Sequence, residues 1–264
     1  MRIIVVENKE MRFEFEHQME LYKNLIEEAV KYEQNGRYKQ ALNIYLNAEK
    51  IVKKYGSKTE ISNLYCRKGR VLAKKGNLTD SLSAFKESLK YIKKGGGTAL
   101  QLANIKGAIG KAYKINGNIE EALNNYQESL KILKEEKERV IYTHSHITTQ
   151  ILEAIAKKLN DIGKIYLFLK DWDKALENCQ EGLKVALDTK KTSAILNSRL
   201  TISRIFSEKK DHNTALDYLM KSIDTAKEEN DLNNELKIYL EVSNVYKLKK
   251  NYKLALNYYK KSLN

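Results

Sequence analysis

The sequence predicts an all-α solenoid built from about six helix hairpins, and two observations support this. The chain of 264 residues contains no proline, whereas average usage would supply about 5%. β-rich and α/β folds place prolines in turns and loops, so their absence favours helices joined by tight turns. A small residue followed by Leu also recurs six times, with spacings of 40, 41, 53, 40 and 40: Ala41-Leu42, Ser81-Leu82, Ala122-Leu123, Ala175-Leu176, Ala215-Leu216 and Ala255-Leu256.

Each copy carries a second block before this pair, separated from it by a turn signal. Twelve residues earlier stands another small residue: Ala29, Gly69, Gly110, Gly163, Ser203 and Ser243. Three positions further on stands a large one: Tyr32, Leu72, Tyr113, Tyr166, Phe206 and Tyr246. The turns are Gly36-Arg37, Gly76-Asn77, Gly117-Asn118, Lys170-Asp171, Lys210-Asp211 and Lys250-Asn251. Gly is favoured just after a helix, and Asn or Asp at the start of the next, so each unit reads as two helices.

The second block continues the helical pattern. Four residues after the small residue comes a bulky one in most copies: Tyr45, Phe85, Tyr126, Cys179, Leu219 and Tyr259. Three later comes a small one: Ala48, Ser88, Ser129, Gly182, Ser222 and Ser262. Offsets of three, four and seven place these residues on one helical face. A single hairpin cannot bury this face alone, so the units are expected to stack.

The pattern resembles the tetratricopeptide repeat, and the stretch GKAYKINGNIEEAL from Gly110 to Leu123 matches it almost residue for residue. The resemblance runs from about Tyr22 to Asn264 and implies a right-handed superhelix. The family's period is about 34 residues, so a period of 40 predicts helices about one turn longer. HEAT and armadillo arrays also have periods near 40, but the small and aromatic code fits them poorly. The forty-residue form is similar to the repeats of bacterial Rap/NprR/PlcR peptide receptors and of some eukaryotic adaptors.

The domain organisation predicted is an N-terminal extension or cap at residues 1–21 and a repeat array at residues 22–264. Phe13, Phe15 and Met19 are expected to cover the first repeat. About 13 extra residues, near 137–150, are expected to lengthen the first helix of repeat four, from about Arg139 to Leu169; a helical spacer is the alternative. Gly95 to Gly97 predicts a turn between repeats rather than a phosphate-binding loop.

The far end of the array is expected to lack a cap. Tyr246, Tyr258 and Tyr259 would then have no following helix to cover them. Either the chain is a shortened piece, or this end associates with another molecule, which includes self-association.

Composition and charge indicate which partners and which cellular compartment to expect. The formal net charge of +14 favours acidic proteins or peptides as partners, with nucleic acid a weaker second. No stretch approaches the roughly 20 apolar residues of a membrane span, and Ile3 to Val6 is too short for a secretory segment. Cys66 and Cys179 form no CxxC pair, so neither a disulfide framework nor a zinc site is indicated. We therefore expect a cytoplasmic protein with free thiols.

No constellation in the sequence predicts catalysis or a cofactor. The histidines are His17, His144, His146 and His212. His144 and His146, two residues apart, would point to different sides of a helix, which argues against a metal pair. Acidic residues lie mainly beside Lys and Arg at helical spacing, as on a solvated surface. A non-enzymatic protein is expected.

A binding surface is the remaining prediction. The resemblance implies that the first helix of each unit lines the concave side, exposing its second, fifth, ninth and twelfth motif positions. The ninth positions are Val30, Arg70, Lys111, Lys164, Arg204 and Asn244. The second positions are Lys23, Asn63, Asn104, Lys157, Asn197 and Lys237. The candidate ligand-binding set is Asn63, Arg70, Asn104, Lys111, Asn160, Lys164, Asn197, Arg204 and Asn244.

This set suits an extended peptide. Asn carboxamides both donate and accept hydrogen bonds with a peptide backbone, while Lys and Arg bind carboxylates. With 48 Lys and Arg in the chain, ordinary surface charge would account for part of the stripe. The clamp that some relatives use for chaperone tails needs Lys at a fifth and Asn at a ninth position. Here Ile26 and Val30, or Cys66 and Arg70, stand there, so that role is not expected.

Three functions remain open. The first is a non-catalytic adaptor or sensor that binds an acidic or extended peptide in its concave groove. The second is the sensory half of a peptide-responsive transcriptional regulator without its DNA-binding domain. The third is direct nucleic-acid binding through general basic charge, which ranks last because few aromatic residues are left over for stacking on bases.

Overall fold

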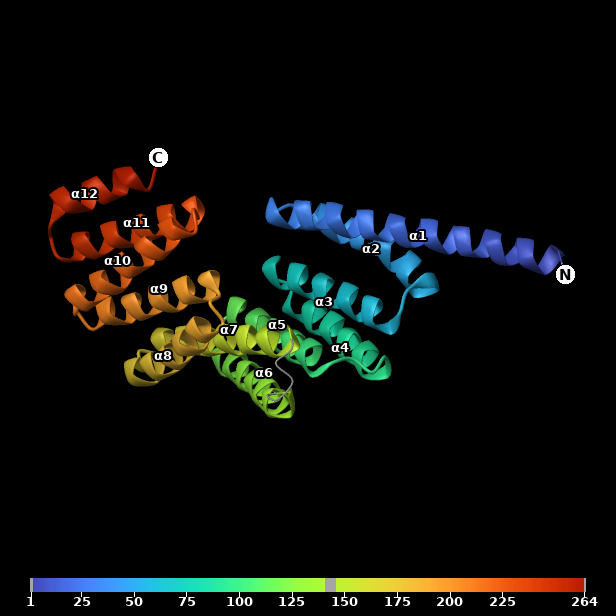
Figure 1. The fold of residues 1–264 in the computed structure, drawn as a ribbon, viewed down its shortest axis with the longest axis horizontal. Helices are drawn as coiled ribbons and strands as arrows, with labels where there is room; N and C mark the ends of the chain where they lie inside the picture. The colour runs from blue at the N-terminus through green and yellow to red at the C-terminus, as the bar shows by residue number, and fades with distance from the viewer. Residues whose placement is uncertain (1, 141–145, 264) are drawn as a thin grey trace. The chain divides into compact units, whose positions relative to one another are not determined.

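The computed structural model describes the backbone of residues 2–140 and 146–263, and their side chains from residue 11 onward. These parts of the chain form twelve α-helices and no strand (Figure 1). The helices are α1 (Arg2–Gln34), α2 (Tyr38–Tyr55), α3 (Lys58–Lys74), α4 (Leu78–Lys94), α5 (Ala99–Ile115), α6 (Ile119–Val140), α7 (His146–Phe168), α8 (Trp172–Asp188), α9 (Thr192–Glu208), α10 (His212–Glu228), α11 (Leu232–Leu248) and α12 (Tyr252–Lys261). The all-α solenoid is confirmed.

The chain divides into two compact units, residues 1–129 and residues 130–264. In the first unit, α1 packs on α2 and α3 on α4, and α5 follows against both α3 and α4. In the second unit, the hairpins are α7 with α8, α9 with α10, and α11 with α12. Each hairpin also contacts the next, through α8 with α9 and through α10 with α11. These neighbours along the chain are the stacked helix pairs that the repeat predicts.

The small residues sit where two helices of a hairpin approach most closely. Ala41, Ala175 and Ala215 are completely buried. A Cβ atom placed on Gly163 would lie 2.3 Å from the Cys179 sulfur, so a larger residue would not fit without movement. Small side chains at these positions therefore set the spacing between helices.

Buried serines add hydrogen bonds to this packing. Ser62 and Ser88 each donate to the other's backbone carbonyl across α3 and α4, both at 2.8 Å. Ser129 donates to the carbonyl of Ala103 at 2.6 Å, and Ser243 to that of Ala255 at 2.7 Å. Each hydroxyl is thereby satisfied inside the apolar interface, where an unpaired polar group would be costly.

The predicted turns are confirmed. Glycine or lysine adopts a positive φ at all six: Gly36, Gly76, Gly117, Lys170, Lys210 and Lys250. The following Asn77, Asp171, Asp211 and Asn251 each accept a hydrogen bond from a backbone N–H in the first turn of the next helix. Gly96, also at positive φ, lies in the expected turn between α4 and α5. Sequence and backbone geometry therefore agree on where each helix ends.

Two helices, not one, are longer, one on either side of the insertion. α6 has 22 residues and α7 has 23, compared with 17 in α3 or α9. The prediction of a helix beginning near Arg139 is wrong, because Arg139 belongs to α6 and α7 begins at His146. His144 lies outside the described residues. The predicted lengthening of the first helix of repeat four is confirmed.

The N-terminal extension is continuous with the first repeat, since α1 runs over 33 residues without a break at residue 22. Met19 is buried as predicted. Phe15 meets the Tyr55 ring edge-on but keeps much of its surface exposed. Phe13 is mostly exposed and stacks on His17 of its own helix, so the prediction that Phe13 covers the first repeat is wrong.

An ionic cluster between α2 and α3 gives the first unit a pH-dependent contribution to stability. Burial raises the pKa of the Glu49 carboxyl, but hydrogen bonds from Lys53, Lys68 and Tyr65 outweigh it and lower the pKa to about 2. The Tyr65 hydroxyl donates to Glu49 Oε1 at 2.7 Å. A lowered pKa in the folded state stabilises the protein above the ordinary pKa of 4.5, and this stabilisation is lost as pH falls toward 2.

We expect Glu49→Gln to have a lower free energy of unfolding than the wild type at about pH 7 and to lose less of it on acidification. Urea unfolding at about pH 7 and about pH 3 measures the free energy of unfolding of both proteins and its loss on acidification. Equal losses for the two proteins would show that Glu49 does not carry this pH dependence.

Candidate peptide-binding site

The first helices of successive hairpins are neighbours within each unit. α3 contacts α5 in the first unit, and α9 contacts both α7 and α11 in the second. The second and ninth motif positions are seven residues apart and so share a helical face. Residues in the same register on these helices therefore belong to one surface of each unit.

In the first unit, the candidate residues lie on α3 and α5 and are all exposed: Asn63, Arg70, Asn104 and Lys111. Each helix presents one amide and, two turns later, one cation. Beneath Arg70, burial raises the pKa of the Cys66 thiol, although Arg70 and Arg67 oppose the shift. The thiol is therefore protonated, and the exposed chemistry here is the amides and cations.

In the second unit, α9 presents the same pairing and α11 the reverse. Asn197, Arg204 and Asn244 are exposed, and Lys164 is partly exposed. The Asn197 amide donates to the carbonyl of Ser193 at 2.7 Å, which leaves its Oδ1 for a ligand N–H. Arg204 on α9 forms an ion pair with Glu241 on α11. This pair shows directly that the ninth position of one first helix faces the next first helix.

The prediction that Asn160 belongs to the binding surface is wrong. Its side chain is only 4% exposed, so it does not belong to the accessible surface as predicted. The Cys179 thiol of α8 donates to Asn160 Oδ1 at 3.7 Å, and burial raises the pKa of that thiol to about 12. Asn160 thus packs inside the α7–α8 hairpin, because this fifth position faces the partner helix.

Two carboxylates that the sequence analysis did not include share these helices. Glu241 neutralises Arg204, and Asp161 lies 3.7 Å from the ammonium of the buried Lys158. Asp161 and Glu241 each come directly after a fifth motif position. They occupy a sixth position, which the sequence analysis did not consider. The predicted stripe of cations and amides in the second unit therefore also contains acidic groups.

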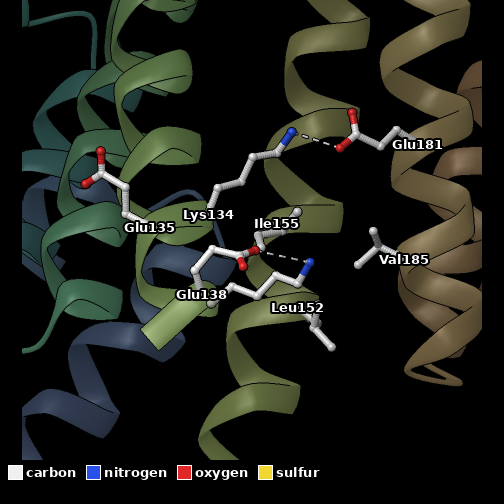
Figure 2. Close-up of a pocket in the computed structure, with 8 residues that line it drawn as sticks. Lys134, Glu135, Glu138, Leu152, Ile155, Glu181 and Val185 are labelled. Atoms are coloured by element: carbon white, nitrogen blue, oxygen red, sulfur yellow. Dashed lines mark hydrogen bonds and ion pairs between the residues drawn. The ribbon is translucent and has the colours of Figure 1, made fainter. Parts of the chain in front are cut away.

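A separate pocket of about 400 Å³ lies between α6, α7 and α8 in the second unit (Figure 2). Lys134 on α6 and Glu181 on α8 form an ion pair across it at 2.9 Å. Its apolar part comes from Leu152 and Ile155 of α7 and Val185 of α8. The pocket arises where α6 and α7 are lengthened, and none of the candidate binding residues lines it.

A family model for the tetratricopeptide repeat matches residues 60–135 and 154–228, more than half of the chain. The chain belongs to the tetratricopeptide repeat family. Such repeat proteins are generally non-catalytic binding modules, and no enzyme family is indicated. Among curated protein sequences, none matches this one.

Solved structures share this tetratricopeptide fold over nearly the whole chain. The apo form of RapI is 18% identical, with a TM-score of 0.64, and the match covers 92% of this chain and 96% of the RapI chain. The apo quorum sensor NprR from B. thuringiensis is 16% identical, with a TM-score of 0.59, and the match covers 99% of this chain and 84% of the NprR chain. A Rap protein complexed with Competence and Sporulation Factor is 12% identical, with a TM-score of 0.64, and the match covers 92% of this chain and 74% of the Rap chain. At these identities the likeness shows the fold.

Within residues 11–140 and 146–263, no three His, Cys, Asp or Glu side chains gather as metal ligands. In the same residues, no helix combines the length and the apolar character that a membrane crossing requires. Cys66 and Cys179 are both buried and unpaired. The accessible chemistry of this tetratricopeptide array is thus its surface of amides, cations and scattered carboxylates.

Proposed function

We propose that this tetratricopeptide array is a non-catalytic adaptor or sensor of the cytoplasm that holds an acidic or extended peptide segment against its first helices. The observation that carries the proposal is the repeated register. An amide and a cation stand seven residues apart on α3, α5, α9 and α11: Asn63 with Arg70, Asn104 with Lys111, Asn197 with Arg204, and Lys237 with Asn244. Ordinary surface charge would account for part of this pattern, but its recurrence in one register on four first helices favours a shared function.

The spacing between helices fits an extended chain. Packed helices lie about 8 to 10 Å apart, and an extended peptide rises about 3.3 Å per residue. A peptide crossing from α9 to α11 would therefore meet a new set of side chains about every three residues. Amides would bind its backbone regardless of sequence, and Arg or Lys would select carboxylates.

Two neighbours support peptide binding by their printed names. One Rap structure is a complex with Competence and Sporulation Factor, and NprR is called a quorum sensor. The second name also favours the alternative that this array is the sensory part of a peptide-responsive regulator. Helix-turn-helix sequence encoded upstream in the full gene would decide for that alternative.

Selection from a random peptide library displayed on phage tests the main proposal. We expect selected peptides to be rich in Asp and Glu and to bind less tightly as salt rises, because exposed charges are screened. Failure to enrich any peptide, or enrichment of neutral peptides whose binding ignores salt, would contradict it.

A further inference from the structure

Four large side chains are exposed along α12 and the turn that follows it. Tyr252, Leu256, Tyr259 and Leu263 follow one another at spacings of four, three and four residues, and they are 66%, 56%, 45% and 68% exposed. This spacing places Tyr252, Leu256 and Tyr259 on one face of α12, and Leu263 lies in the turn just after the helix. We call these four side chains the α12 stripe. No helix in the described part of the chain covers it, and a contiguous exposed apolar surface commonly marks an interaction site.

The internal repeat shows what kind of partner such a face takes. Forty residues earlier, α10 carries Leu216, Leu219 and Ile223 in the positions of Leu256, Tyr259 and Leu263, and these are 9%, 0% and 5% exposed. They are buried in one cluster with three residues of α11: Ile238, Val242 and Val245. The equivalent face of α12 is thus shaped to receive the first helix of a hairpin.

α1 offers the matching surface. Leu21 of α1 is exposed, whereas Ile61, its equivalent forty residues later on α3, is buried in the core shared with α2. His17 and Phe13 lie four and eight residues before Leu21 on the same side of α1 and are also exposed. α1 is therefore a first helix whose face toward a preceding hairpin is not covered in the described chain.

The charges of the two surfaces are opposite. Within residues 11–28, α1 carries five glutamates against Arg12 and Lys23, a net charge of −3 in a chain of net charge +14. Residues 252–263 carry Lys253, Lys260 and Lys261 and no acidic residue, a net charge of +3. Opposite potentials steer association and fix its orientation, so α1 is better suited to this face than a second α12 would be.

We infer that the α12 stripe of one copy binds the α1 face of a second copy, in the way that α10 binds α11. The contact joins two different surfaces, so it is heterologous and leads to rings or to open chains of copies. This association is separate from peptide binding and does not depend on it.

Charge exchange tests the inference with substitutions that leave the core unchanged. We call the α1 face the head and the α12 stripe the tail. The head variant is Glu20→Lys with Glu28→Lys, and the tail variant is Lys253→Glu with Lys260→Glu; all four positions are exposed. In each variant alone, head and tail carry like charges. Mixed together, every head meets a tail of opposite charge. Sedimentation velocity over a concentration series measures association of the full chain.

We expect the wild type to associate with rising concentration, and each variant alone to associate at least about tenfold more weakly, a loss of about 1.4 kcal/mol. An equal mixture of the two variants should associate more tightly than either variant alone. Leu256→Glu should abolish association in every combination, whereas Leu46→Glu, on the exposed side of α2, should not change it. A wild type that stays monomeric, a mixture that fails to associate, or a head variant that associates normally would each overturn the inference.

Discussion

Phe85→Ala is expected to lower the free energy of unfolding by about 3 to 5 kcal/mol, a typical cost for deleting a buried aromatic ring. Phe85 on α4 is 0% exposed. Its ring lies so close to α3 that a Cβ atom on Gly69 would be only 2.8 Å from Phe85 Cε1. Because the glycine side of the contact has no side chain to fill the space, little relaxation can close the cavity. Urea unfolding monitored by circular dichroism measures the loss.

Phe168→Ala is the matched control, since it deletes the same ring from a helix surface. Phe168 on α7 is 67% exposed, so its loss should cost less than about 0.5 kcal/mol. Comparable losses for the two variants would mean that the pairing of small and aromatic residues does not hold the hairpins together.

Reversing Arg70, Lys111, Lys164 and Arg204 to Glu is expected to weaken binding of a selected acidic peptide by at least about fivefold. Exposed ion pairs contribute about 0.5 kcal/mol each, and the two cations of either unit amount to about 1 kcal/mol, or about fivefold in Kd. The reversed charges add repulsion. At Arg204 this is strongest, because its replacement would stand beside Glu241. Isothermal titration calorimetry with the wild type and the variant measures the change.

A second fourfold reversal separates position from overall charge. Lys50, Lys86, Lys184 and Lys221 are exposed on second helices, and reversing them also lowers the formal net charge from +14 to +6. We expect this control to bind the peptide within about threefold of the wild type, since distant exposed charges are largely screened. Equal losses in both reversals would indicate attraction by net charge alone.

The fold could be predicted because its information is local and repeated. A small residue such as Gly69 opposite an aromatic one such as Phe85 specifies a close helix pair, and the turn residues mark where each helix ends. The lengthening of both α6 and α7 could not be predicted, since the repeat spacing gives the number of extra residues but not the helix that takes them. Phe13 was misplaced because an apolar residue near a repeat need not lie on its buried face.

The candidate site was only partly predictable. Motif register correctly gave the exposed positions of Asn63, Arg70, Asn104, Lys111, Asn197, Arg204 and Asn244. It failed at Asn160, because a fifth position can turn toward the partner helix when a small partner such as Cys179 leaves room. The ion pair between Arg204 and Glu241 joins residues 37 positions apart, and only the stacking of α9 on α11 brings them together.

Photocrosslinking of a selected acidic peptide tests most directly whether the ligand lies on the first helices. A photoreactive residue is placed at Asn104 or Asn197, on first helices, and at Asn47, which is exposed, or Asn178, which is partly exposed, on second helices. The account predicts covalent capture from positions 104 and 197 and none from positions 47 and 178. Capture mainly from the second helices, with positions 104 and 197 silent, would contradict it.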